Sequence, residues 1–297
     1  MRLNRRGVVI TKQTGKLLDA AMSIANQDAS DRGDLGFTAR SLVLCTLPHS
    51  DPKTTHFKRK NGNYTLTLAA LSDEIGLPYG TVPRLLLAWI STEIVKTKSK
   101  TLILGSSLSE FLREIGLSRQ GGKRGDITRL REQMRRLFSC YVSCDYHDKN
   151  RDATDGFKIV KKAETWWHPQ NSEQAGLWQS SLTVSDEFYD EVISAPIPID
   201  LGALKALKGS AMQLDLYMWL TFRNSYLKTE TAITWAQLQM QFGSGYVRID
   251  NFKAAFLVAL KKVKVVYPGA DVRAVDIGIL IAPSATHIKK GKILSIR

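Results

Sequence analysis

Hydrophobic residues along the chain follow two periods, and each period predicts a different element. Over residues 64–68 apolar side chains alternate with threonines after an Asn-Gly pair at residues 61–62, which predicts a β-hairpin. Over residues 79–98 the spacing changes to four, as on one side of an α-helix. Because both periods recur along the sequence, the chain is predicted to belong to the α+β class.

The first half of the chain contains a short helix, a glycine-rich turn and a basic helix, in that order. The short helix is predicted within residues 106–117, where a serine stands three residues before Glu110, as in a capping box, and Gly116 marks the end. A turn at residues 121–125 separates it from the basic helix at residues 126–139. The strands predicted next are residues 141–146, 157–167 and 177–184. A sheet that follows a helix-turn-helix is the arrangement of a winged helix.

The second half repeats this order without obvious sequence identity. Its predicted elements are a helix at residues 209–223, a strand at Ile233, a short helix at residues 234–242, a glycine turn, a long helix at residues 247–264, and strands at residues 272–276 and 278–282. Two tandem winged helices therefore account for nearly the whole chain.

The chain is expected to divide into three segments. A predicted helix at residues 11–27 lies in a polar and basic N-terminal stretch, and a strand-like run at residues 37–44 opens the ordered part. Pro196 and Pro198 mark the expected boundary between the winged helices. The predicted segments are a basic N-terminal arm at residues 1–36, an N-terminal winged-helix domain at residues 37–196 and a C-terminal winged-helix domain at residues 197–297.

The charge of the chain points to a polyanionic partner. Among 297 residues, 42 are Lys or Arg and 28 are Asp or Glu, which leaves a formal net charge of +14. No apolar run of about eighteen residues and no signal-peptide pattern occur, so neither a membrane span nor secretion is expected. The three cysteines are too few for a disulfide framework, which fits a reducing cytoplasm.

The basic helix at residues 126–139 presents an apolar face and a cationic surface. At 100° per residue, five apolar side chains fall within about a third of the circumference. These predicted core residues are Ile127, Leu130, Met134, Leu137 and Phe138. The residues on or beside the remaining surface are Lys123, Arg124, Thr128, Arg131 and Arg135, with Arg129 and Arg136 on the side opposite the core.

An arginine-rich helix of this kind is suited to DNA, because the guanidinium group can bind a phosphate or the guanine edge with two hydrogen bonds. A solvated charged face is the commoner role of such residues. Here, however, only Asp126 and Glu132 offset the cations Arg119, Lys123, Arg124, Arg129, Arg131, Arg135 and Arg136. The excess predicts that this helix contacts DNA.

The long helix of the second half is less basic, but its first turns carry groups that can read base edges. These residues are Ser244, Tyr246, Arg248, Asn251 and Lys253. Asn pairs well with adenine and Arg with guanine. The alternative interpretation is a serine N-cap followed by ordinary surface residues, and the sequence fits both.

Lysines in or beside the first predicted wing are expected to contact phosphates without reading sequence. These are Lys158, Lys161 and Lys162, with Tyr146 nearby. The neighbouring Trp166-Trp167 pair could stack on bases, although core packing is the favoured role.

Motifs that carry catalysis are missing from the sequence. No Gly-Lys pair is followed by the hydroxyl residue of a P-loop, and the five histidines form neither HxH nor HExxH. Cys140, Cys144 and His147 could suggest zinc, but a fourth ligand is not evident, and buried small residues on a strand are favoured. The chain is therefore expected not to be an enzyme and to hold neither a metal nor a cofactor.

Three segments of the first half resemble the RepA family of bacterial plasmid replication initiators. They are LPYGTVPRLLLAWI at residues 77–90, LILGSSL at residues 102–108 and TRLREQMRRLF at residues 128–138. The resemblance spans roughly residues 37–200. In the second half, Phe242-Gly243-Ser244 followed by Arg248, Phe252 and Lys253 is similar to the C-terminal winged helix of the TrfA-type initiators.

The resemblance implies binding to double-stranded plasmid origin DNA at repeats called iterons, opening of adjacent A·T-rich DNA, and recruitment of the host initiator and replicative helicase. It also implies a homodimer in equilibrium with monomer and control of copy number. By matching position, Arg124, Arg131 and Arg135 fall in the N-terminal recognition helix, and Ser244, Arg248 and Lys253 in the C-terminal one. Residues 249–251 are less basic than the family pattern, which leaves open which helix reads more bases.

Two alternatives stay beside the initiator hypothesis. A transcriptional repressor with tandem winged helices would have the same basic surface, although no effector domain is visible in the sequence. A relaxase or primase-type enzyme would need a tyrosine near clustered histidines or a carboxylate triad, and Asp145 with Asp148 lacks a clear third member.

Overall fold

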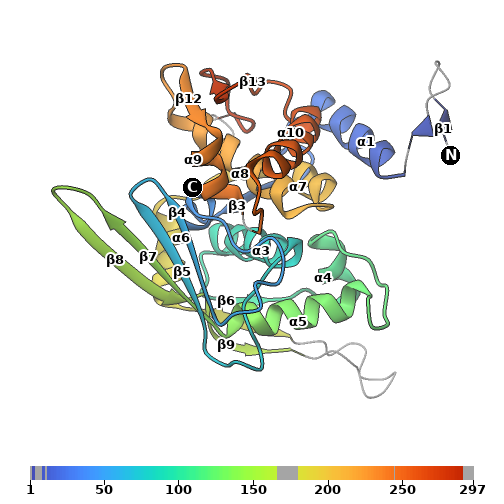
Figure 1. Cartoon of the computed structure of the whole chain (residues 1–297). Helices are drawn as coiled ribbons and strands as arrows, with labels where there is room; N and C mark the ends of the chain where they lie inside the picture. Colours follow the sequence, from blue (N-terminus) through green and yellow to red (C-terminus); the bar gives the residue numbers. More distant parts are fainter. Residues whose placement is uncertain (1, 4–8, 11, 166–179, 244, 290–297) are drawn as a thin grey trace. The chain divides into compact units, whose positions relative to one another are not determined.

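The computed structural model describes residues 2–3, 9–10, 12–165, 180–243 and 245–289, and it has the predicted α+β class (Figure 1). The chain divides into two compact units. The central unit consists of residues 37–197, and the terminal unit combines residues 1–36 with residues 198–297. The strands β3 (Leu35–Thr38) and β11 (Ile197–Asp200) contain the two points at which the chain passes from one unit to the other.

The central unit contains five helices and two antiparallel sheets within its described residues. Its elements are α2 (Arg40–Leu44), β4 (His56–Asn61), β5 (Tyr64–Ala70), α3 (Thr81–Thr97), β6 (Thr101–Ile103), α4 (Leu108–Glu114), α5 (Asp126–Phe138), β7 (Cys140–His147), β8 (Asp152–Lys158), β9 (Val160–Glu164), β10 (Ser181–Val184) and α6 (Asp186–Ser194). The predicted hairpin at the Asn-Gly pair is confirmed as β4–β5, with Gly62 at φ 58°.

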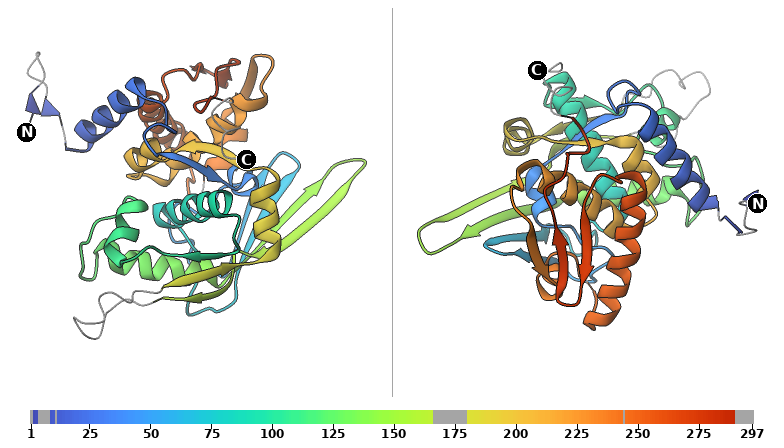
Figure 2. Two further views of the ribbon diagram at one scale, coloured as in Figure 1. Left: turned by 180° about the vertical axis from the view of Figure 1, so that it is seen from behind. Right: turned by 90° about the horizontal axis from the view of Figure 1, so that it is seen from above.

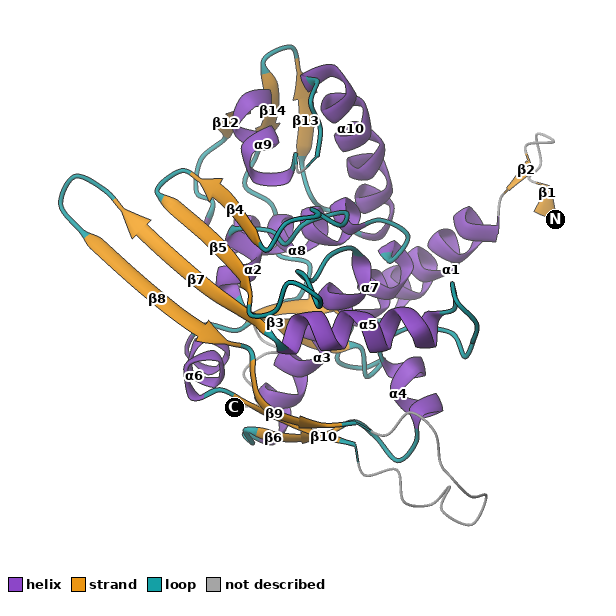
Figure 3. Cartoon of the chain, turned by 60° about the horizontal axis from the view of Figure 1, so that its bottom comes forward, coloured by secondary structure: helices purple, strands orange, loops and turns teal. Residues whose placement is uncertain are grey.

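The two sheets are formed by different sets of strands (Figure 3). The larger sheet has the strand order β4-β5-β7-β8, and the smaller has the order β6-β10-β9. The strand predicted at residues 157–167 is therefore wrong as a single element, because the chain changes sheet at Ile159. Ile159 is fully buried, and its carbonyl accepts a hydrogen bond from the Ser185 amide.

Residues 37–44 were expected to form one strand, and this prediction is wrong. The strand β3 ends at Thr38, and α2 occupies Arg40–Leu44. The carboxylate of Glu191 on α6 accepts a hydrogen bond from the Ser41 amide at 2.8 Å, which satisfies a free donor at the start of α2. A partner 150 residues away in sequence thus stabilises the helix.

The helix α3 lies at the centre of the central unit and packs against α5, α6 and β6. It is buried on nearly every side, in agreement with its apolar sequence. The buried guanidinium of Arg84 donates hydrogen bonds to the carbonyls of Leu47, Pro48 and Gly80, at 2.7, 3.2 and 2.6 Å. These bonds compensate for the removal of the charge from water.

The terminal unit is built around α8, α10 and a three-stranded sheet with the order β12-β14-β13. The helix α1 packs on α7 and α10, so the segment predicted as an N-terminal arm contributes a helix to this unit (Figure 2). The elements are β1 (Arg2–Leu3), β2 (Val9–Ile10), α1 (Lys12–Asn26), α7 (Leu201–Leu207), α8 (Ala211–Tyr226), β12 (Thr231–Thr234), α9 (Trp235–Phe242), α10 (Ile249–Val266), β13 (Val272–Val275) and β14 (Gly278–Ile281).

A buried ion pair connects the N-terminal segment of the terminal unit to the start of α7. The Arg32 guanidinium bonds to the carboxylate of Asp200 and, at 2.6 Å, to that of Asp34. Asp200 is also the N-cap of α7, where its carboxylate accepts the Ala203 amide at 2.9 Å. The buried carboxylate is thus both paired and hydrogen-bonded, as a buried charge requires.

The same network continues to the C-terminal segment. The Tyr217 hydroxyl accepts the Asp200 amide at 2.9 Å and lies 2.7 Å from Nδ1 of His287. The His287 ring stacks on Tyr267 with centroids 4.6 Å apart, and Asn224 donates to the Tyr267 hydroxyl at 2.8 Å. Residues far apart in sequence are therefore fixed together by polar contacts as well as by the apolar core.

The free energy of unfolding is expected to fall at mildly acidic pH because of His287. Burial lowers the pKa of His287 below its ordinary value of 6.5; Asp200 opposes this shift, and Arg32 adds to it. The unfolded state then binds the proton more readily, so stability is complete above about pH 6.5 and declines below it by at most about 1.4 kcal/mol per pH unit. Urea unfolding at a series of pH values measures this slope.

A His287→Gln variant should flatten the slope between about pH 5 and 6.5, and His56→Gln, at an exposed position, should leave it unchanged. An unaltered slope in His287→Gln would assign the pH dependence to another group.

Candidate nucleic-acid interface

The helices α4 and α5 are joined by a turn that is fixed by hydrogen bonds. The Asp126 carboxylate accepts the amide and hydroxyl of Ser118, at 2.9 and 2.7 Å. The Thr128 hydroxyl donates to the carbonyl of Gly122 at 2.8 Å. The first turn of α5 is thus tied to the preceding loop at Ser118 and Gly122, which sets the direction in which its basic residues project.

The glycine before α5 has no room for a side chain. A Cβ atom at Gly125 would lie 2.2 Å from the Gly121 carbonyl oxygen and 2.3 Å from that of Gln120. Gly125→Ala is therefore expected to open the turn, lower the free energy of unfolding by about 1–3 kcal/mol and weaken DNA binding. Gly121→Ala is the matched control, because a Cβ there meets open space. Urea unfolding measures the stability of the two variants, and fluorescence anisotropy with labelled duplex measures their affinity for DNA. Equal stability and equal affinity of the two variants would contradict this prediction.

The outward face of α5 is cationic. Thr128, Arg131 and Arg135 are exposed and follow one line at spacings of three and four. Arg131 and Arg135 form no ion pair with the residues that the structure describes. Two further exposed cations, Lys123 and Arg124, lie in the turn before the helix. This face can therefore offer several guanidinium and ammonium groups to a polyanion without first breaking an internal pair.

The other two arginines of α5 have internal partners. Arg129 is exposed but lies 3.1 Å from Asp126. Arg136 is only 16% exposed, lies 2.8 Å from Glu132 and donates to the Leu77 carbonyl at 3.1 Å. Its guanidinium also lies over the Tyr79 ring. The prediction that Arg136 faces away from the core is wrong, because its long side chain folds back over the edge of α5.

The five apolar residues of α5 do not share one degree of burial. Leu130, Met134 and Leu137 are buried, as predicted. Ile127 and Phe138 are half-buried at the two ends of the helix. The predicted apolar face is therefore correct at its centre and partly open at its ends.

The residues assigned to the first wing lie in two different sheets. Lys161 and Lys162 are exposed on β9, which contacts α5, and Lys162 pairs with Thr183 on β10. Lys158 and Tyr146, by contrast, belong to β8 and β7 of the larger sheet. The prediction that these strands form one sheet is therefore wrong. The predicted tryptophan pair lies outside the described residues.

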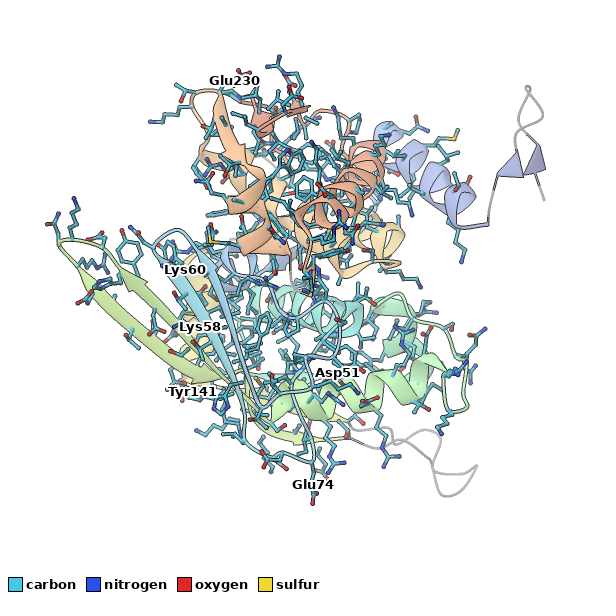
Figure 4. The ribbon with its side chains drawn as sticks, in the orientation of Figure 1. Asp51, Lys58, Lys60, Glu74, Tyr141 and Glu230 are labelled. Atoms are coloured by element: carbon cyan, nitrogen blue, oxygen red, sulfur yellow. The ribbon has the colours of Figure 1, made fainter. Side chains whose placement is uncertain are left out.

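One open face of the larger sheet adds further cations. Lys58 and Lys60 alternate with buried Arg59 along β4, and Figure 4 labels both lysines together with Tyr141 on this sheet. Strand pairing aligns His56, Tyr141 and Lys158 across the sheet, two positions along from Lys58. Because alternate residues share a face, Lys58, Lys60 and Lys158 lie on the same side.

The cysteines lie on the opposite face of this sheet. Cys45 and Cys144 line a cavity of about 430 Å³ between α2, α6 and the sheet. Burial raises the pKa of Cys45 to about 11 and the pKa values of Cys140 and Cys144 to about 12, so all three thiols are protonated at neutral pH. Alternation along β7 puts His147 on the other face, so Cys140, Cys144 and His147 do not converge on one ion.

In the terminal unit, two of the residues predicted to contact bases pack against neighbouring side chains near the start of α10. Tyr246 packs edge-on against Phe252 at 5.8 Å, and its carbonyl accepts a hydrogen bond from Gln239 at 3.1 Å. The Lys253 ammonium lies 5.1 Å from the centre of the Trp235 ring. Tyr246 and Lys253 are accordingly half-buried and contribute to packing.

Two other residues predicted to contact bases face solvent. Arg248 is the N-cap of α10 and lies 3.3 Å from the Asp250 carboxylate, and Asn251 is exposed in the first turn. Ser244 lies outside the described residues. Sequence analysis missed Val247 and Val258, which are 98% and 56% exposed. The signal for Val258 was an apolar residue on the polar side of an amphipathic helix, and Val247 lies just before the N-cap of that helix.

The model of the plasmid-encoded RepA protein family matches residues 77–237, which is more than half of the chain. The chain belongs to this family. The resemblance seen in three sequence segments is thereby confirmed. The RepA match covers α4, α5 and the β9–β10 hairpin, and it continues past residue 200 into α9.

Two solved structures resemble this member of the RepA family in fold. A crystal structure of domains 2 and 3 of RctB has a TM-score of 0.55 and 10% identity, and it covers 84% of this chain and 99% of that one. A second crystal structure of RctB domains 2–3 has a TM-score of 0.50 and 12% identity, with 78% and 92% covered. At these identities the likeness extends to the fold alone. No curated protein matches the chain, and no helix in its described part is long and apolar enough to span a membrane.

Proposed function

We propose that this protein initiates plasmid replication by binding iteron repeats at its origin through two winged helices. The observation that carries the proposal is the cationic outward face of α5, in a chain of the plasmid-encoded RepA family. Arginines on a helix whose first turn is held by its loop are suited to phosphates and guanine edges in the major groove.

The winged-helix part of the proposal is supported by the order of elements in both units. In the central unit the order is α3-β6-α4-α5-β9-β10, with the last strand in the middle of its sheet. In the terminal unit the order is α8-β12-α9-α10-β13-β14, and again the last strand is in the middle. By this correspondence α5 and α10 are the recognition helices and β9–β10 is the first wing. The β7–β8 hairpin is inserted between α5 and β9.

The wider role is part of the same proposal. The protein would open adjacent A·T-rich DNA, recruit the host initiator and replicative helicase, and control copy number through an equilibrium between monomer and homodimer. It would act in the bacterial cytoplasm by binding energy, without enzymatic activity. Contact with about six to ten phosphates would reduce affinity by about three to five decades between 50 and 200 mM salt.

A footprint of the full chain on the DNA that flanks its own gene tests the proposal, at about 150 mM salt with random competitor DNA present. One recognition helix in each of two successive major grooves would protect about two helical turns per repeat. Regularly spaced protection over direct repeats beside an A·T-rich stretch is the expected result. A single protected palindrome at the promoter would instead indicate a repressor, and magnesium-dependent cleavage of supercoiled origin DNA would indicate an enzyme.

A further inference from the structure

The outward face of α10 carries a line of small and apolar side chains. Asn251, Ala254 and Val258 lie within α10 at spacings of three and four, which places them on one side of the helix, and Val247 stands just before it, next to the N-cap Arg248. All four are exposed. The opposite side packs into the core through Phe252, Phe256, Leu260 and Val263. We call the exposed line the valine stripe.

The valine stripe differs in chemistry from the corresponding surface of α5. In the shared order of elements the two helices hold the same place, yet α5 presents Thr128, Arg131 and Arg135. The α10 surface replaces guanidinium groups with methyl groups and one amide. Two helices in the same place with such different side chains are suited to different base pairs.

We propose that the valine stripe reads A·T pairs, with Val247 and Val258 in contact with thymine methyl groups and Asn251 bonded to adenine. In the major groove an A·T pair presents the N7 acceptor and N6 donor of adenine and the C5-methyl group of thymine. An amide satisfies the first two, and an aliphatic side chain packs on the third. This inference rests on the proposed function.

The charges around the stripe favour a nucleic acid over a second protein surface. Arg248 is next to Val247, and the exposed Lys261 lies nearly one turn beyond Val258. The carboxylate nearest the stripe in sequence, Asp250, is paired with Arg248 at 3.3 Å. An apolar line with a cation at each end matches a groove floor between two phosphate backbones.

The position of Val247 is set by a close-packed turn. Gly243 is the C-cap of α9, and a Cβ atom there would lie 2.5 Å from the Gln239 carbonyl oxygen, so the chain leaves the helix at a position without room for a side chain. The hydrogen bond from Gln239 to the Tyr246 carbonyl then holds the residue before Val247. Val247 therefore follows a residue that is held by α9, and its own side chain is 98% exposed and available to a ligand.

The experiment replaces thymine by deoxyuridine in the protected DNA, one position at a time, which removes a methyl group and leaves base pairing intact. Fluorescence anisotropy gives the dissociation constant of the full chain for each duplex. At the contacted positions, wild type should lose about fourfold in affinity per methyl group. Val247→Ala or Val258→Ala should lose a similar factor on thymine DNA and become insensitive to deoxyuridine at one position each. The control Arg113→Ala, at an exposed site on α4, should retain wild-type sensitivity.

The outcomes separate this inference from the proposed function. Specific origin binding that ignores every deoxyuridine would overturn the inference and leave the proposed function standing. No preference for origin DNA over random DNA would contradict the proposed function itself. If Val247→Ala changes the sedimentation coefficient and leaves deoxyuridine sensitivity intact, the stripe is an interface between copies of this chain, and the inference is wrong.

Discussion

Replacing Arg131 and Arg135 together by alanine is expected to reduce affinity for origin DNA by about 30-fold or more, since each lost base contact costs about 1–3 kcal/mol. Both side chains are exposed on the same line of α5, and neither has an ion-pair partner among the residues that the structure describes. Their removal should therefore act on DNA binding directly and leave the free energy of unfolding nearly unchanged. Fluorescence anisotropy at about 150 mM salt, with random competitor, measures the loss.

The salt dependence of DNA binding by the same variant distinguishes contacts with bases from contacts with phosphates. If the two arginines bind phosphates, the slope of log K against log salt should fall by about one per residue, and random DNA should lose as much affinity as origin DNA. If they read bases, origin DNA should lose more. The control is Arg113→Ala on α4, where the arginine is exposed and lies 3.6 Å from Glu110. Unchanged affinity in the double variant would show that α5 does not contact DNA.

Replacing Asp200 by alanine is expected to lower the free energy of unfolding by about 3–5 kcal/mol, the usual cost of removing one partner of a buried ion pair. The substitution leaves the Arg32 guanidinium buried with Asp34 as its remaining carboxylate. It also removes the N-cap of α7, because the Ala203 amide loses its acceptor. Urea unfolding of the full chain, followed by tryptophan fluorescence, measures the change.

Two further variants test whether the loss of stability comes from the buried ion pair. Asp34→Ala should cost less, because Asp34 is more exposed than Asp200 and has no capping role in the described structure. Adding Arg32→Ala to Asp200→Ala should restore part of the lost stability, since no unpaired buried charge is then left. A loss below about 1 kcal/mol for Asp200→Ala would mean that the pair is open to water.

The elements that the sequence predicted correctly are those whose evidence is local. The Asn-Gly turn fixed the register of β4–β5, and Ser107 caps α4 by accepting the Glu110 amide. Even there the structure differs in one local detail. The Glu110 carboxylate bonds to Ser106 and so does not close a capping box with Ser107.

The errors have a common physical cause. Arg136 was placed outward by helical spacing, but the Leu77 carbonyl and the Tyr79 ring provide partners at the edge of the helix. Lys158 was expected in one sheet with Lys161 because nothing in a run of strand-forming residues shows where the chain leaves one sheet for another. In both cases the deciding contact comes from a segment that periodicity does not describe.

The sequence by itself determined the α+β class, the two sets of helix, turn and basic or amphipathic helix, and the RepA family, because turn chemistry and the period of apolar residues act between near neighbours. Only the tertiary structure decided which cations are free and which are paired, that α1 packs with the terminal unit, and that Arg32 meets Asp200. Those contacts join residues as far as 168 positions apart, and their energy depends on burial that no local pattern specifies.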